Sequence, residues 1–87
     1  MKKKILVVDD DPNVREYLTS LFEDNGYEVH VAVDSSQGFD KAKKIIPDLI
    51  TMDIEMPGEW GPRLYRKLAT DDALKAVPVI IISGLEG

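Results

Sequence analysis

The chain has 87 residues, of which 44% are hydrophobic and 31% are charged, and its formal net charge is −5. This balance is typical of one small globular domain rather than of a disordered chain. The acidic surplus argues against nucleic-acid binding, which needs a basic surface, and the lack of cysteine excludes disulfides and thiolate metal sites. No apolar run approaches the ~20 residues that span a bilayer, so we expect a cytoplasmic protein with no membrane partner.

The first third of the chain predicts a buried strand followed by an amphipathic helix. Residues 4–9 form a short apolar run, typical of a strand buried on both faces of a parallel sheet. Asp11 is placed to cap a helix with Pro12 at its first position, and Asn-Gly at 25–26 ends it. The residues between them carry an apolar stripe at helical spacing, namely Val14, Tyr17, Leu18, Leu21 and Phe22.

The middle of the chain repeats this pattern. Residues 27–32 alternate between apolar and more polar side chains, which predicts a strand with one face toward solvent. Such a strand suits the edge of a sheet. Ser35 or Ser36 is expected to cap the next helix, and Pro47 closes it. The inward residues of that helix are expected to be Phe39, Ala42, Ile45 and Ile46.

The last part predicts two more strands around a weaker helix. Residues 48–53 read as a strand that ends in an acid, and residues 55–61 are dense enough in Pro and Gly to form a loop. A helix follows, with Leu64, Leu68 and Tyr65 expected to point inward. Residues 77–83 are the most strand-prone segment of the chain.

Strands that alternate with helices predict a parallel sheet with helices on both faces. In such sheets the functional crevice lies beyond the carboxyl ends of the strands. Polar residues that end apolar strands are therefore the candidates for a site, and these are Asp9, Asp10, Asp53 and Ser83.

The three acids among these candidates predict a metal site. If the strands that precede Asp9 and Asp53 are neighbours, about 4.8 Å apart, the carboxylates of Asp9, Asp10 and Asp53 converge. Their mutual repulsion would raise pKa values and destabilise the fold unless a cation is bound, and hard oxygen ligands suit Mg²⁺. Acids at strand ends also occur as helix caps or solvated loop charges, and Asp11 is assigned to the helix cap.

Three segments resemble the receiver domain of two-component response regulators. They are Leu-Val-Val-Asp-Asp at 6–10, Met-Asp-Ile-Glu-Met-Pro-Gly at 52–58 and Ile-Ile-Ser-Gly at 81–84, and their order and spacing extend the likeness over residues 1–87. The resemblance implies a flavodoxin-like (CheY-like) α/β fold, a doubly wound parallel sheet of order 2-1-3-4. It also implies a single receiver domain over 1–87 that ends just after strand four and lacks the last helix-strand-helix.

The resemblance assigns a role to each candidate. Asp53 matches the phosphoacceptor, which takes a phosphoryl group from a phosphohistidine on a sensor histidine kinase or phosphotransfer protein. Asp10 matches a direct Mg²⁺ ligand, Asp9 a ligand that acts largely through water, and Glu55 a residue whose backbone carbonyl binds the metal. Ser83 matches the switch hydroxyl. A protein of this kind is not an enzyme beyond catalysing its own phosphotransfer and dephosphorylation.

One departure from the family pattern leaves alternatives open. The lysine expected at the end of a fifth strand is absent, and strand four is expected to expose apolar residues that favour a homo-oligomer. A receiver-like interaction or dimerisation module that is not phosphorylated would also fit. A haloacid-dehalogenase-type Mg²⁺ phosphatase fits less well, because its Asp-x-Asp pair follows the first strand whereas Asp53-Ile54-Glu55 follows the third.

Overall fold

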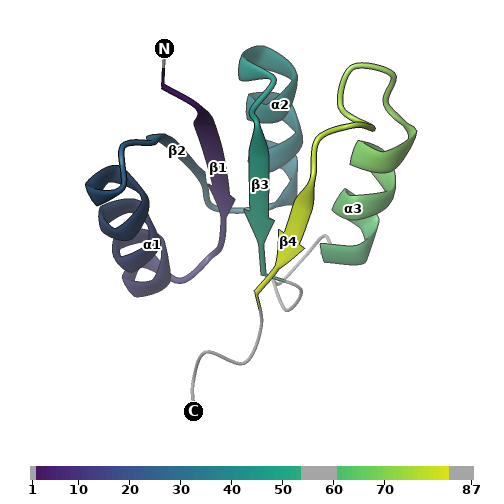
Figure 1. The fold of residues 1–87 in the computed structure, drawn as a ribbon. Coiled ribbons are helices and arrows are strands. Elements are labelled where there is room, and N and C mark those ends of the chain that lie inside the picture. The colour runs from purple at the N-terminus through teal and green to yellow at the C-terminus, as the bar shows by residue number, and fades with distance from the viewer. Residues whose placement is uncertain (1, 54–60, 83–87) are drawn as a thin grey trace.

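The computed structural model describes residues 2–53 and 61–82, in which strands and helices alternate along the chain (Figure 1). In order they are β1 (Lys4–Val8), α1 (Pro12–Asp24), β2 (Glu28–Ala32), α2 (Ser35–Ile45), β3 (Leu49–Met52), α3 (Gly61–Thr70) and β4 (Val79–Ile81). All neighbouring strands are parallel, and their order in the sheet is β2-β1-β3-β4. The predicted strand order is therefore confirmed.

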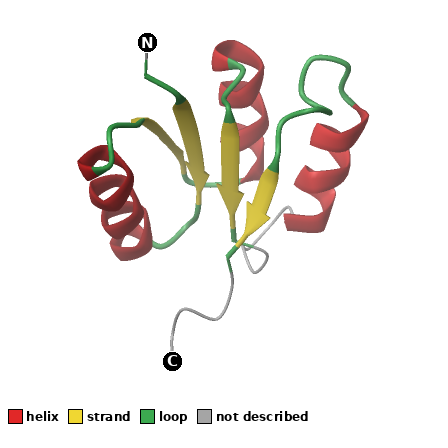
Figure 2. Ribbon diagram, in the orientation of Figure 1, coloured by secondary structure: helices red, strands yellow, loops and turns green. Residues whose placement is uncertain are grey.

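Helices cover both faces of the sheet (Figure 2). Side chains of β1 point to the two faces in turn, so that Leu6 and Val8 pack in the cluster with α2 and α3, whereas Ile5 and Val7 pack with Leu18 of α1. All four of these β1 side chains are buried. The central strand thus has the continuous apolar sequence that a strand covered on both faces requires.

The helix caps match the sequence expectation for α1 but not for α2. The Asp11 side chain accepts a hydrogen bond of 2.8 Å from the N–H of Asn13, as its position before Pro12 predicts. The expectation that Ser35 or Ser36 caps α2 is wrong, because Asp34 accepts from the N–H of Gln37 at 2.8 Å. Both serines lie inside the helix, where Ser35 is buried.

Several apolar residues lie further out than their spacing predicts. Tyr65 is 48% exposed, so its predicted inward position is wrong, and Tyr17 of the α1 stripe is 64% exposed. At the edge of the described sheet, β4 is shorter than predicted, and Ile80 and Ile81 are 50% and 49% exposed. The helices therefore bury a narrower stripe than the periodicity indicates, and β4 leaves apolar surface uncovered.

Gly38 allows α2 to approach β1 closely. A Cβ atom at this position would lie 3.1 and 3.2 Å from the two γ-carbons of Val8 and 3.3 Å from a δ-carbon of Leu64. Valine is stiff at χ1, so its side chain has little room to retreat. The glycine costs helix propensity but lets α2 pack tightly on the sheet beneath the end of β1.

Thr51 is a polar residue inside the apolar interior of β3. It lies between Val7 and Ile80 in the strand register and is 1% exposed. Its hydroxyl oxygen is buried and has no hydrogen-bond partner. A buried hydroxyl without a partner costs about 1–3 kcal/mol, so Thr51 lowers the stability of the fold.

We therefore expect Thr51→Val to stabilise the protein by about 1 kcal/mol, because valine keeps the shape and removes the unpaired hydroxyl. For a domain of this size that raises Tm by roughly 4–8 °C, measurable by thermal unfolding followed by circular dichroism. Thr51→Ser is the matched control, since it keeps the hydroxyl, removes a buried methyl group and should lower Tm. A Tm that falls in Thr51→Val would show that the hydroxyl is paired.

Candidate metal centre

The strand register brings the acids of β1 and β3 to one end of the sheet. Val8 is paired with Met52, and the N–H of Asp53 continues this ladder by donating to the Val8 carbonyl at 3.1 Å. On the other side of β1, the N–H of Asp9 donates to the Ala32 carbonyl, also at 3.1 Å. The backbone of each strand thus holds the first acid after it in place.

The carboxylates of Asp9, Asp10 and Asp53 form a single cluster. One oxygen from each lies within 4.8 Å of the others, a spacing that allows them to share one metal ion. Asp9 is buried, Asp53 is half-buried and Asp10 is exposed, so the cluster opens to solvent on one side. The three acids that the sequence predicted to converge do converge.

Asp9 is held at each of its polar groups. Besides its own N–H bond to β2, its carboxylate accepts a 2.9 Å hydrogen bond from the N–H of Asp11. Its carbonyl oxygen accepts a 2.8 Å hydrogen bond from Nη1 of Arg15 in α1. Sequence reasoning missed Arg15, whose only signal is its place in the second turn of the helix that follows the acids.

The electrostatics of the cluster favour binding a cation. Burial raises the pKa of the Asp9 carboxyl above its ordinary value of 3.8, and the negative charges of Asp53, Asp10 and Asp11 raise it further. The hydrogen bond from the N–H of Asp11 acts in the opposite direction. A bound divalent cation would remove the repulsion that raises this pKa.

The donor set fits Mg²⁺. All three side chains are carboxylates, which are hard oxygen ligands, and the exposed side of the cluster leaves room for the water ligands that Mg²⁺ keeps. Asp11 contributes to the charge, but its carboxylate caps α1 and is not part of the cluster. The cluster can therefore hold a hard divalent cation next to the half-buried carboxylate of Asp53.

Two predicted members of the site, Glu55 and Ser83, lie outside the described residues, so their roles stay predictions. The ladder between β3 and β4 extends to the residue before Ser83, because the N–H of Ile82 donates to the Met52 carbonyl at 2.9 Å. The described part of β4 therefore runs toward the same end of the sheet as the acids.

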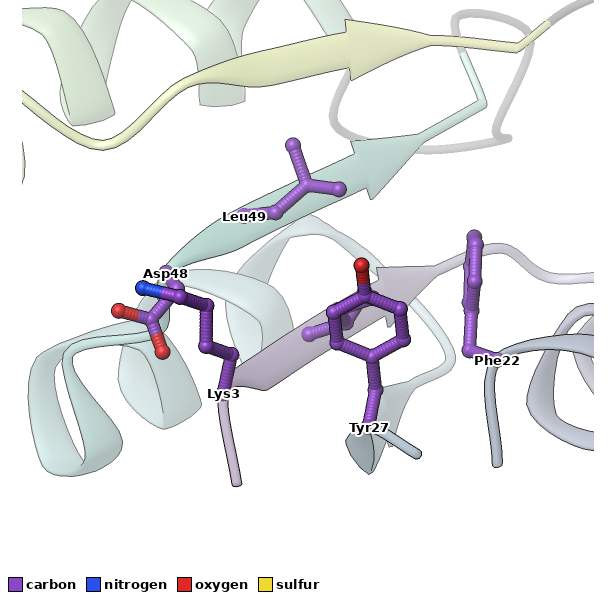
Figure 3. A pocket seen from close by; sticks show the side chains of 6 residues that line it. Lys3, Phe22, Tyr27, Asp48 and Leu49 are labelled. Carbon is purple, nitrogen blue, oxygen red and sulfur yellow. The ribbon is translucent and has the colours of Figure 1, made fainter. Parts of the chain in front are cut away.

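A separate cavity of about 220 Å³ lies by the amino ends of β1 and β3 (Figure 3). Its lining is mostly apolar, with Phe22 and Tyr27 in an edge-to-face contact at a centroid distance of 6.3 Å and with Lys3 and Asp48 on one side. It shares no residue with the acidic cluster, which lies at the carboxyl ends.

None of the helices in the described ranges 2–53 and 61–82 is long and apolar enough to cross a membrane.

The chain is similar to known proteins along its length. The response regulator receiver domain family matches residues 5–87. Protein Rrf1 of Nitratidesulfovibrio vulgaris is 33% identical over 87 residues, which cover 100% of this chain and 63% of that protein. Protein PilH of Pseudomonas aeruginosa is 39% identical over 80 residues, which cover 92% of this chain and 66% of that protein.

A solved structure supports the same family. The chemotaxis response regulator CheY4 of Vibrio cholerae superposes with a TM-score of 0.89 at 30% identity, over 93% of this chain and 68% of that one. The predicted flavodoxin-like fold is thus confirmed. The chain spans just under two thirds of the length of the two curated relatives.

The raised pKa of Asp9 predicts how stability depends on pH without a metal. The folded protein keeps the Asp9 proton at pH values where the unfolded chain has lost it, so the charged form of this group destabilises the fold at neutral pH. We expect Asp9→Asn to raise Tm at neutral pH in the presence of a chelator. This gain should shrink as the pH falls through the folded-state pKa toward 3.8, where Asp9 itself is protonated.

The measurement is Tm against pH by circular dichroism, with the exposed Asp40→Asn as control. Mg²⁺ at about 100 times its Kd should stabilise the wild type by about 2.7 kcal/mol and the Asp9→Asn variant by less. A variant that is less stable than the wild type at neutral pH without metal would contradict the repulsion argument.

Proposed function

The chain belongs to the response regulator receiver domain family of two-component systems, and we propose that it is a phosphoacceptor module that receives a phosphoryl group on Asp53. The donor is a phosphohistidine on a sensor histidine kinase or a phosphotransfer protein. The observation that carries this proposal is the convergence of three strand-end carboxylates within 4.8 Å. In this role residues 1–87 would form one receiver domain that acts in the cytoplasm and is not an enzyme for other substrates.

The transfer step asks little covalent chemistry of the protein. A carboxylate oxygen of Asp53 attacks phosphorus, the phosphorus–nitrogen bond breaks, and its electron pair stays on the histidine nitrogen. Asp53 is half-buried, so a donor can still reach this residue. The hydrogen bond from the N–H of Asp53 to the Val8 carbonyl holds the backbone of the nucleophile in place, and positioning is a large part of catalysis in phosphoryl transfer.

The other acids would hold the cation that offsets the negative charge in this step. Asp10, Asp9, Asp53 and the backbone carbonyl of Glu55 would hold Mg²⁺, which neutralises charge between the anionic carboxylates and the anionic phosphoryl group. Asp9 is buried and hydrogen-bonded, which suits a ligand that orients water, whereas the exposed Asp10 suits direct coordination. Ser83 would donate a hydrogen bond to the phosphoryl group and move toward it when Asp53 is phosphorylated.

A test of this proposal is labelling with acetyl phosphate and Mg²⁺. We expect the wild type to gain the mass of one phosphoryl group in intact mass spectrometry and Asp53→Asn to gain none, because the amide is not a nucleophile here. Asp40→Asn, an exposed acid on α2, should label like the wild type. Labelling that persists in Asp53→Asn would overturn the assignment, and repeated release of phosphate from phosphate monoesters would favour the phosphatase alternative.

A second proposal is that the chain self-associates through β4. In the described part of the chain β4 forms the outer edge of the sheet, and two of its isoleucines are about half exposed. An edge strand with unpaired backbone groups and apolar side chains is a template for another strand. A second copy that pairs along β4 would satisfy the edge backbone groups and cover part of Ile80 on one face of the sheet and part of Ile81 on the other.

Light scattering coupled to size exclusion tests this association. We expect the wild type to form a dimer at tens of micromolar, and Ile80→Lys to shift it to monomer, because a charge on the edge blocks strand pairing. Tyr17→Lys is the matched control, since Tyr17 is 64% exposed but lies on α1. A stable wild-type monomer, or a dimer unaffected by Ile80→Lys, would contradict the proposal.

A further inference from the structure

Arg15 makes a contact that its position in the chain does not predict. Its side chain is half-buried, and its Nη1 donates a 2.8 Å hydrogen bond to the backbone carbonyl of Asp9. The guanidinium thus reaches from α1 to the end of β1, six residues earlier in the sequence. In the described ranges this is the one hydrogen bond recorded for its side chain.

The geometry of the helix start explains this reach. Asp11 caps α1 and the first helical bond runs from the N–H of Arg15 to the Asp11 carbonyl at 3.0 Å. Side chains on a helix tilt toward its N-terminus, so a long residue at this position leans back over the first turn. A positive charge so close to the N-terminus gains nothing from the helix dipole. Helix stability therefore does not account for an arginine at this position, whereas the hydrogen bond to Asp9 does.

The acceptor of this bond determines what it controls. The carbonyl of Asp9 belongs to the peptide plane that it shares with the N–H of Asp10, and a peptide unit is rigid. Fixing that oxygen therefore fixes the direction in which the chain leaves Asp9 and enters Asp10. Asp10 itself is exposed, so its side chain receives little restraint from packing.

We propose that Arg15 is a positioning residue for the magnesium site, which orients the Asp10 carboxylate by clamping the Asp9–Asp10 peptide. This inference rests on the proposed Mg²⁺ site of the phosphoacceptor. The Asp9 carboxylate is already held by the N–H of Asp11, and the Asp9 N–H by Ala32. Arg15 supplies the third restraint, and it acts on the peptide that leads to the exposed ligand.

The positive charge of Arg15 would by itself weaken Mg²⁺ binding, whereas its proposed positioning role would strengthen it. A positive side chain beside three carboxylates repels a cation, so if Arg15 acted only through its charge, its removal would tighten Mg²⁺ binding. If Arg15 positions Asp10, its removal weakens Mg²⁺ binding even though the site becomes more negative. Groups that orient metal ligands typically contribute 10–100-fold in affinity. The two roles therefore differ in sign.

The experiment measures Mg²⁺ affinity of the full chain by isothermal titration calorimetry. We expect Arg15→Met to raise the Kd roughly tenfold, the low end of the range for such groups. Arg15→Lys keeps the charge but lacks the planar donor fork, so its Kd should also rise, by less. Arg66→Met, an exposed arginine on α3, is the matched control and should keep the wild-type Kd.

A second readout needs no metal. The amide of Asp10 shares the clamped peptide, so its ¹⁵N signal in the metal-free protein should shift or broaden in both Arg15 variants and stay unchanged in Arg66→Met. If Arg15→Met does not fold, Arg15→Lys carries the test, because a role through charge alone predicts no change for it.

The outcomes separate this inference from the proposed function. Wild-type binding that Asp10→Asn abolishes, together with equal or tighter binding by the Arg15 variants, overturns the role of Arg15 and leaves the metal site standing. A wild type that binds no Mg²⁺ overturns the metal site and this inference with it. Weaker binding in both Arg15 variants, with a changed Asp10 amide, supports it.

Discussion

The hydrogen-bonded register between β1 and β3 is the constraint on which the acidic site depends. Val8 lies opposite Met52, and the next step along both strands sets Asp9 beside Asp53. A slip of one residue would turn the apolar side chains of a strand to the opposite face. Both faces of β1 are apolar, so the register is held by the packing fit of Leu6 and Val8 in one cluster and of Ile5 and Val7 in the other. The same burial that stabilises the sheet therefore brings the acids together.

This arrangement places a destabilising charge cluster at the end of the most buried strand. Burial and three neighbouring acids raise the pKa of Asp9, so the site opposes folding when no cation is present. Asp9 is nevertheless held by three hydrogen bonds: its N–H donates to the Ala32 carbonyl, its carboxylate accepts from the N–H of Asp11, and its carbonyl accepts from the Arg15 side chain. The bond from the Asp11 N–H orients the carboxylate despite the repulsion, and the other two hold the backbone of Asp9. Local rules are broken in this way mostly where function requires it, which is the physical reason to read the cluster as a site.

The sequence predicted the sheet and the acidic cluster because both depend on strong, local signals. Apolar runs that end in Asp9 and Asp53 predict two parallel strands, and parallel strands have their carboxyl ends at the same edge of the sheet. Details decided by tertiary contacts were not predictable: Asp34, Ser35 and Ser36 are all good caps, and burial of Ser35 leaves Asp34 to cap α2. Arg15 reads as an ordinary helix charge, because its acceptor is a backbone carbonyl, which has no signature in the sequence.

The charges of the site would link metal binding to the proposed phosphorylation of Asp53. In the proposed function, an aspartyl phosphate at Asp53 replaces one negative charge with about two, so the cluster attracts a cation more strongly after transfer than before. Linkage is reciprocal, so a cation bound beside Asp10 must stabilise the phosphorylated state by the same factor. In its proposed role, Arg15 would act on both equilibria through a single peptide, because the orientation of Asp10 would determine how well the carboxylates hold a cation. A helix residue that contacts neither the metal nor the phosphoryl group would in this way shift the equilibrium between the phosphorylated and unphosphorylated states.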